Sequence, residues 1–230
     1  MNSELKRVGL LGGTFDPVHN GHLDLAAKTA QLFDLQEVVF VPVSQSPHKL
    51  DDQPTPSLHR VAMLELALEQ KTTFSIELFE VEKGGVSYTI ETLSRLREKH
   101  PDWELFLILG ADAFLLMDTW KSCTEIIKLC HVLVSTRPGI KLEVPDKLSQ
   151  TLGLKKPLLE NNDLILPMTL NTTTEKTIRL YQIPTPNTSS REIRQRVQEE
   201  KEIKNLLPPA VDHYIMHHRL YRAESPPTKV

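Results

Sequence analysis

The stretch GGTFDPVHNGH, Gly12 to His22, follows directly on the short apolar run Val8–Leu11. A short apolar run that ends in glycine is typical of a buried strand, and helical spacing of apolar residues begins at His22. The quoted stretch is therefore predicted to be the loop between a first strand and a first helix. In an open parallel sheet such a loop lies at the carboxyl end of its strand, where ligands bind.

Short apolar segments alternate with amphipathic segments along the rest of the chain. We expect further strands at residues 37–42, 74–81, 104–110, 131–139 and 177–184, and helices at 22–35, 57–70, 87–100, 189–202 and 208–221. This order predicts an α/β fold, a doubly wound, mainly parallel, Rossmann-like sheet with helices on both faces. We expect a single domain over 1–222, with a polar excursion at about 140–176 and a disordered tail at 223–230.

Charge and cysteine content limit the class of protein. The net charge is −3, whereas a general nucleic-acid binder needs a broad basic surface. Cys123 and Cys130 are too few and too widely spaced for a C-x-x-C pair or a zinc site, which suggests reduced thiols. The longest apolar stretch, Leu105–Met117, is too short to cross a bilayer. We expect a cytoplasmic protein that binds neither nucleic acid nor membrane, with a homo-oligomer left open.

Two histidines lie three positions apart in the loop after the first strand. His19 falls in the turn, and His22 falls in or near the first helical turn, where free amides and the helix dipole favour an anion. One histidine could be incidental in a glycine-rich turn, but two in register favour phosphate binding. The loop lacks the G-x-x-x-x-G-K-[ST] and G-x-G-x-x-G patterns, which disfavours a P-loop ATPase and a dehydrogenase.

A second candidate phosphate site lies in TSSREIR, residues 188–194. Ser189 and Glu192 fit a capping box, so a helix is predicted to begin here. The same cap brings Ser190, exposed amides and Arg194 within one helical turn, and arginine can bind phosphate through two parallel hydrogen bonds. Helix capping alone would account for the serine and the glutamate. If both helix starts border one crevice, a polyphosphate is held from two sides.

Together, the two motifs resemble the paired signature of nucleotidyltransferases with an H-x-G-H motif and an S-S-x-x-x-R type motif. More closely, the chain is similar to the bacterial nicotinate mononucleotide adenylyltransferases from Val8 to about Tyr221. The segments that carry this likeness are PHK (47–49), SYTIET (87–92), GADAF (110–114), TW (119–120), TRPG (136–139) and LLPPAVDHYI (206–215). The chain departs from the family at Arg191, where threonine is usual, and in a longer 140–176 stretch.

The resemblance implies adenylyl transfer from ATP to nicotinate mononucleotide, which gives the dinucleotide and pyrophosphate in NAD biosynthesis. It also implies Mg²⁺ as cofactor, bound mainly through the substrate phosphates and not by a dedicated metal site. A phosphate monoester is mostly dianionic at neutral pH, so the attacking acceptor needs no general base. The protein then has to position two anions and stabilise the charge of the transition state.

The family pattern also implies roles for individual residues. The expected catalytic residues are His19, His22, Lys49 and Arg194. The expected ATP-binding residues are Gly12, Gly13, Thr14, Phe15, His19, His22, Gly110, Asp112, Ser189, Ser190 and Arg194. The expected mononucleotide-binding residues are His48, Lys49, Tyr88, Thr89, Trp120 and Arg137.

The acceptor site has a physical basis and structural alternatives. Trp120 can stack on a pyridine ring, and Thr89 lies near a helix start that favours a carboxylate, so we expect nicotinate to be preferred over nicotinamide mononucleotide. Each of these residues also has a purely structural explanation. Trp120 could be a buried core residue, SYT (87–89) could serve only to begin a helix, and Asp112 could be a helix N-cap. The helical spacing of His213, His217 and His218 suggests a metal site, although a solvated helix face suffices.

Other activities remain as alternatives. Within the superfamily, nicotinamide mononucleotide, phosphopantetheine or a cytidylyl-transfer substrate could be the acceptor. Class I aminoacyl-tRNA synthetases share a similar histidine motif, but this chain leaves no room for an anticodon-binding domain. A nucleotide-binding regulator without catalysis is the alternative outside the enzymes.

Overall fold

The computed structural model describes residues 4–45, 53–136, 143–154, 168–184, 186 and 188–222. Its strands are β1 (Lys6–Gly13), β2 (Glu37–Pro42), β3 (Phe74–Ile76), β4 (Trp103–Gly110), β5 (His131–Thr136), β6 (Met168–Asn171) and β7 (Thr177–Gln182). Its helices are α1 (Asn20–Leu32), α2 (Ser57–Leu68), α3 (Phe79–Lys83), α4 (Thr89–Lys99), α5 (Ala111–Leu115), α6 (Cys123–Leu129), α7 (Asp146–Thr151), α8 (Ser190–Gln198) and α9 (Pro209–His217), with a 3₁₀ turn, η1 (Met117–Thr119).

The strands form one sheet in the order β3-β2-β1-β4-β5-β7-β6. Neighbouring strands are parallel except β6 and β7, which are antiparallel. The predicted α/β, mainly parallel, doubly wound fold is therefore confirmed as a single domain. The chain builds outward from β1 through β2 and β3, then returns to place β4 on the other side of β1. Strand order thus reverses between β1 and β4, which is where such folds bind ligands.

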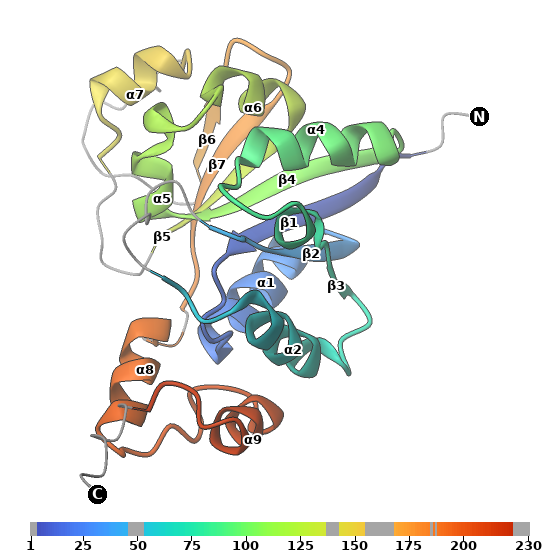
Figure 1. Ribbon diagram of the computed structural model, residues 1–230. Coiled ribbons are helices and arrows are strands. Elements are labelled where there is room, and N and C mark those ends of the chain that lie inside the picture. The colour runs from blue at the N-terminus through green and yellow to red at the C-terminus, as the bar shows by residue number, and fades with distance from the viewer. Residues whose placement is uncertain are drawn as a thin grey trace, which may run out of the picture.

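Helices cover both faces of the sheet and enclose two cores (Figure 1). The core beside α1, α2, α8 and α9 contains Phe40 and Ile215, and the core beside α4, α6 and α7 contains Leu93. Successive residues of a strand face opposite sides, so Leu10 packs into the second core and Leu11 into the first. Burial on both faces explains why β1 is a continuous apolar run instead of an alternating one.

The predicted strand at 74–81 is wrong in its second half. β3 ends at Ile76, and α3 begins at Phe79. The Glu77 carboxylate accepts a hydrogen bond from the Phe79 amide at 3.1 Å, which turns the chain out of the sheet. Gly84, with φ of 69°, ends the helix in a conformation that suits glycine. The apolar alternation in FSIELFEV gives no sign of this local side-chain bond.

The polar excursion contributes more to the sheet than its sequence indicates. In its described part, α7 places Leu148 and Leu152 in the second core, and β6 adds an antiparallel edge strand with Leu170 buried. These few apolar residues are part of the second core of the sheet. Residues 223–230, the predicted tail, lie outside the described residues. Of the helices in the described ranges, α1 is the longest at 13 residues, and none is a candidate membrane span.

Candidate active site

Two cavities open beside the carboxyl ends of β1 and β4. The larger has a volume of about 1000 Å³ and is built from the β1–α1 loop, the start of α5 and the start of α8. The smaller has a volume of about 360 Å³ and lies against α4 and the segment after η1. Thr14 and Val43 line both cavities, so the two adjoin at the end of β1. The site can therefore accept two ligands that meet near Thr14.

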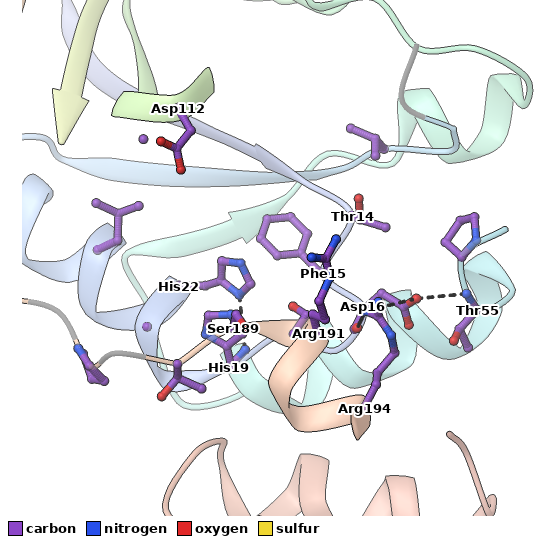
Figure 2. A pocket seen from close by; sticks show the side chains of 18 of the residues that line it. Thr14, Phe15, Asp16, His19, His22, Thr55, Asp112, Ser189, Arg191 and Arg194 are labelled. Atoms are coloured by element: carbon purple, nitrogen blue, oxygen red, sulfur yellow. Dashed lines mark hydrogen bonds and ion pairs between the residues drawn. The ribbon is translucent and has the colours of Figure 1, made fainter. Parts of the chain in front are cut away.

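Most of the predicted nucleotide-binding residues gather in the larger cavity (Figure 2). Those that line it are Thr14, Phe15, His19, His22, Gly110, Asp112, Ser189, Ser190 and Arg194. The two imidazoles near the start of the chain and Arg194 near its end thus line one cavity. Gly12 and Gly13, which the family pattern assigns to the ATP site, line the smaller cavity together with Tyr88, Thr89 and Trp120. His48, Lys49 and Arg137 lie outside the described residues.

His19 and His22 form a stacked pair at the start of α1. His19 is the N-cap residue, with extended φ of −145°, and His22 is three residues later. Their ring centroids lie 3.7 Å apart with an interplanar angle of 23°. The His19 amide donates to Nδ1 of His22 at 3.3 Å. In a neutral imidazole with Nδ1 as acceptor the proton is on Nε2, so His22 has an Nε2–H donor available for a ligand.

Burial keeps both rings uncharged near neutral pH. It lowers the pKa of His19 to about 4, against a smaller opposing effect of the Glu192 charge. Burial also lowers the pKa of His22 well below 6.5, and the neighbouring His19 lowers it further. Nδ1 of His19 is buried without a hydrogen-bond partner among the described residues. Two neutral rings that line the cavity can donate hydrogen bonds to a ligand without carrying a fixed charge.

Two neighbours hold the rings in place. Phe15 is buried, meets the His22 ring edge-on at 5.1 Å, and packs on Phe40. Its φ of 49° is unusual for a residue other than glycine, a feature that often marks functional sites. A Cβ added to Gly21 would lie 3.0 Å from the His19 ring. The glycine of the motif is therefore needed for the close approach of this ring.

The start of α8 is fastened to the β1–α1 loop. Ser189 caps the helix by accepting from the Glu192 amide at 3.1 Å. Ser190 Oγ donates to the Pro17 carbonyl at 2.9 Å, and Arg194 Nη1 donates to the Asp16 carbonyl at 2.7 Å. These side chains thus hold the two motifs together, as well as lining the cavity. In the predicted capping box only the serine half is formed, because the Glu192 carboxylate pairs with Arg196 at 3.0 Å.

Arg60 of α2 is a buried residue that our sequence reasoning missed. Its guanidinium donates to the carbonyl oxygens of Thr14 at 2.7 Å, Val43 at 2.8 Å and Thr55 at 2.8 Å. These carbonyls belong to three segments that border the larger cavity, so one side chain fixes their spacing. Arg60 is 1% exposed, and burial lowers its pKa. In an amphipathic helix an arginine ordinarily indicates the solvated face, so the sequence gives no signal for this role.

Asp16 is a second missed residue, although it lies inside the quoted loop. It is 5% exposed, and its carboxylate accepts from the Tyr221 hydroxyl at 2.7 Å and the Thr55 amide at 3.1 Å. The carboxylate also lies 4.0 Å from Arg194 Nη1. Asp16 therefore connects the first loop to the C-terminal turn after α9. The burial and the nearby Asp16 carboxylate together raise the pKa of Tyr221 above the usual range.

The smaller cavity combines aromatic rings with a helix start. Thr89 is the first residue of α4, after Tyr88 as N-cap, and Trp120 is half-buried. Lys121 Nζ lies 4.2 Å from the centre of the Tyr88 ring, within reach of a cation–π interaction. The same Lys121 donates to Glu91 Oε1 at 2.9 Å. This cavity can accept a flat ring with an anionic substituent.

Glu80 is a buried carboxyl in the wall of the smaller cavity that sequence reasoning also missed. It is 6% exposed, and its Oε1 accepts from Thr92 Oγ1 at 2.5 Å. Its Oε2 is buried without a hydrogen-bond partner in the described part of the chain. Burial raises the pKa of Glu80, because the charged form loses its hydration. The contact with Thr92 ties α3 to the first turn of α4.

Comparisons with known proteins agree on one family. The cytidylyltransferase-like family model matches residues 10–196. A probable nicotinate-nucleotide adenylyltransferase of Moorella thermoacetica is 38% identical over 94% of this chain and 92% of its own length. One of Desulfitobacterium hafniense is 36% identical over 96% and 99%. The solved nicotinic acid mononucleotide adenylyltransferase of Plasmodium falciparum, complexed with NaAD, is similar in fold, with a TM-score of 0.68, 19% identity and coverage of 94% and 97%.

Proposed function

This chain belongs to the nicotinate-nucleotide adenylyltransferase family, and we propose that it transfers the adenylyl group of ATP to nicotinate mononucleotide. The products are nicotinate adenine dinucleotide and pyrophosphate, a step of NAD biosynthesis. One structural observation carries the proposal beyond the family likeness. The cavity with the two imidazoles and the start of α8 adjoins a second cavity with aromatic rings and the start of α4. A two-substrate transfer between phosphates needs such a pair.

The reaction proceeds in the proposed site by direct attack. A phosphate oxygen of the acceptor attacks the α-phosphorus of ATP, and the bond between that phosphorus and the bridging oxygen to the β-phosphorus breaks. The bond's electron pair leaves with pyrophosphate. The acceptor phosphate is mostly dianionic at pH 7, so no side chain has to remove a proton. The chain's task is to place the two phosphates near Thr14 and to hold the reacting groups in line.

The stacked histidines supply hydrogen-bond donors to the phosphates. His22 offers Nε2–H, because its Nδ1 accepts from the His19 amide. At the start of α1 the Asn20 and His22 amides already donate to the carbonyls of Leu206 and His19, so the further donors are the first amides of α8, and the positive ends of both helix dipoles favour an anion. Neutral donors fixed in advance stabilise developing charge without having to reorient. Ser189, Ser190 and Arg194 complete the proposed site from the α8 side.

Mg²⁺ is proposed as the cofactor, held mainly by the substrate phosphates. Across the described ranges no cluster of three or more histidine, cysteine or acidic residues could hold a metal ion. The carboxylates of the larger cavity are Asp16, which already accepts from Tyr221 and Thr55, and the exposed Asp112. Phosphate oxygens completed by water molecules fit the preference of Mg²⁺ for oxygen ligands. When bound, the ion neutralises phosphate charge.

The smaller cavity is the proposed site of the acceptor. Trp120 and Tyr88 offer aromatic faces on which a pyridine ring can stack. The backbone amides and the dipole at the start of α4, from Thr89 onward, favour a carboxylate. Nicotinate mononucleotide should therefore react with a higher kcat/KM than nicotinamide mononucleotide. Equal values, or a preference for the amide, would contradict this assignment. Phosphopantetheine in the same assay tests the remaining acceptor.

Cellular location and assembly are also part of the proposal. Cys123 and Cys130 are free and buried, as suits the reducing cytoplasm, where we place the enzyme. A homo-oligomer remains a prediction, and light scattering on the purified protein tests it.

A transfer assay with one matched pair of variants tests the function. Wild-type protein with ATP, Mg²⁺ and nicotinate mononucleotide should form the dinucleotide and release pyrophosphate in equal amounts. His22→Ala should lower kcat by about 10²- to 10³-fold with a similar KM for the mononucleotide. His213→Ala, an exposed position on α9, is the control and should keep wild-type rates. A wild-type protein that releases no pyrophosphate overturns the function, and a collapsed melting transition in His22→Ala would make that residue structural.

A further inference from the structure

Arg191 stands where the family usually has threonine, and it points into the larger cavity. It is the second residue of α8 and lines the cavity. Figure 2 shows its side chain extending from the start of α8 towards Phe15, whereas Arg194 runs to Asp16. The side chain is exposed in the free protein. A guanidinium therefore faces the space assigned to the triphosphate.

Among the residues that the structure describes, the Arg191 guanidinium has no partner, unlike its polar neighbours on α8. Ser190 donates to the Pro17 carbonyl, and Arg194 Nη1 donates to the Asp16 carbonyl. The nearest acidic residue in the sequence, Glu192, pairs with Arg196. Arg191 itself makes no hydrogen bond or ion pair with the residues that the structure describes. As far as the described part of the chain goes, all its N–H donors are thus available to a ligand.

The position of Arg191 is electrostatically unfavourable for the free protein. The first turn of a helix exposes unpaired amides and the positive end of the dipole, where anions stabilise and cations destabilise. A cation at this position that has no partner does not stabilise the folded protein. A bound anion reverses the sign of this interaction, because it meets the amides and the guanidinium together. The location therefore points to an anionic ligand.

The order of residues along the cavity indicates which phosphates Arg191 meets. Gly110 and Asp112 follow β4 at one side, and Figure 2 places Asp112 across His22 from α8. The α-phosphate must lie near Thr14, where the acceptor cavity adjoins. The Asp112 carboxylate can accept from a ribose hydroxyl but repels phosphate, so adenosine fits the Asp112 side and the β- and γ-phosphates extend towards α8.

We propose that Arg191 binds the β- and γ-phosphates of ATP and neutralises the pyrophosphate as it leaves. The inference rests on the proposed function and names a further contact of the same site. When the bond from the α-phosphorus to the bridging oxygen breaks, the electron pair moves to pyrophosphate, which gains negative charge. Arg191 meets that charge with two parallel N–H groups, whereas the usual threonine offers one neutral hydroxyl.

Binding measurements without the acceptor test the proposal independently of turnover. The probes are ATP, pyrophosphate and AMP, titrated by calorimetry into wild type, Arg191→Gln and the control Arg196→Gln. Arg196 carries the same charge on the same helix, but it pairs with Glu192 and does not line the cavity. In Arg191→Gln, affinity for ATP and pyrophosphate should fall by about ten- to a hundredfold, and affinity for AMP should stay within about twofold. Arg196→Gln should bind all three like wild type.

The steady-state rates and the melting temperature complete the test. Arg191→Gln should lower kcat/KM for ATP by a similar factor, with an unchanged KM for nicotinate mononucleotide and a melting temperature that does not fall. Pyrophosphate binding within twofold of wild type, or an equal loss for AMP, overturns the role of Arg191. If wild type binds ATP but transfers nothing to the acceptor, the proposed function fails, and the comparison of pyrophosphate with AMP still decides the role of Arg191.

Discussion

The buried His19 ring should make the free energy of unfolding depend on pH in a way that one substitution removes. Burial lowers its pKa to about 4 in the folded protein, against 6.5 in the unfolded chain. Above pH 6.5 the ring is neutral in both states and the shift has no effect. Below pH 6.5 the unfolded chain takes up a proton that the folded protein does not accept until about pH 4, so unfolding becomes more favourable as pH falls.

The magnitude follows from the two pKa values. At pH 5 the unfolded ring is almost fully protonated, whereas about a tenth of the folded rings are. The free energy of unfolding should therefore fall by about 2 kcal/mol from pH 7.5 to pH 5 through His19 alone. His22 acts in the same direction, because burial and the neighbouring ring lower its pKa as well.

Urea denaturation of wild type and His19→Asn at pH 7.5, 6 and 5 measures this contribution. Asparagine is a good N-cap residue, so the start of α1 is kept while the titrating ring is removed. The loss of stability between pH 7.5 and 5 should be about 2 kcal/mol smaller in His19→Asn, whatever its stability at pH 7.5. His213→Asn, at an exposed position on α9, should keep the wild-type dependence. An identical loss in His19→Asn and wild type would refute the argument.

Three further substitutions test how the cavities are built. Gly21→Ala places a Cβ 3.0 Å from the His19 ring yet favours helix, so kcat should fall while the melting temperature does not; a fall in both would contradict this. Arg60→Met leaves three carbonyls without their donor and should lower the free energy of unfolding by about 3 kcal/mol, measured in urea. The pKa of Glu80 is raised in the folded protein, so the free energy of unfolding falls as pH rises above 4.5. Glu80→Gln should therefore stabilise the protein more at pH 7.5 than at pH 4, and equal effects at the two pH values would refute this.

The sequence predicted the fold well where local pattern and topology agree. The apolar run Val8–Leu11 predicts a buried central strand. The loop after such a strand lies at the ligand-binding edge of the sheet, however the helices pack. This is why the positions of His19 and His22 could be predicted without coordinates. The strand at 74–81 was predicted too long because the Glu77 side chain, and not hydropathy, ends it.

The parts of the site that sequence reasoning missed depend on contacts between distant segments. Arg60 is polar, lies in an amphipathic helix and reaches carbonyls up to 46 residues away. Asp16 and Tyr221 meet across 205 residues, and no local pattern links them. Such partners become visible only when the fold has placed α2 and the turn after α9 against the first loop.

The proposed site separates neutral donors from permanent charge. His19 and His22 are uncharged near pH 7 in the free protein, and they stand beside the β1–α1 loop where the α-phosphate must lie. The guanidinium groups of Arg191 and Arg194 stand on the α8 side. Contacts that hold ATP and the transition state equally lower KM without raising kcat, whereas donors at the α-phosphate act mainly as the bond breaks. The arrangement therefore assigns rate enhancement to the imidazoles and binding of the β- and γ-phosphates to the guanidinium groups, so a histidine substitution should lower kcat even where pyrophosphate still binds.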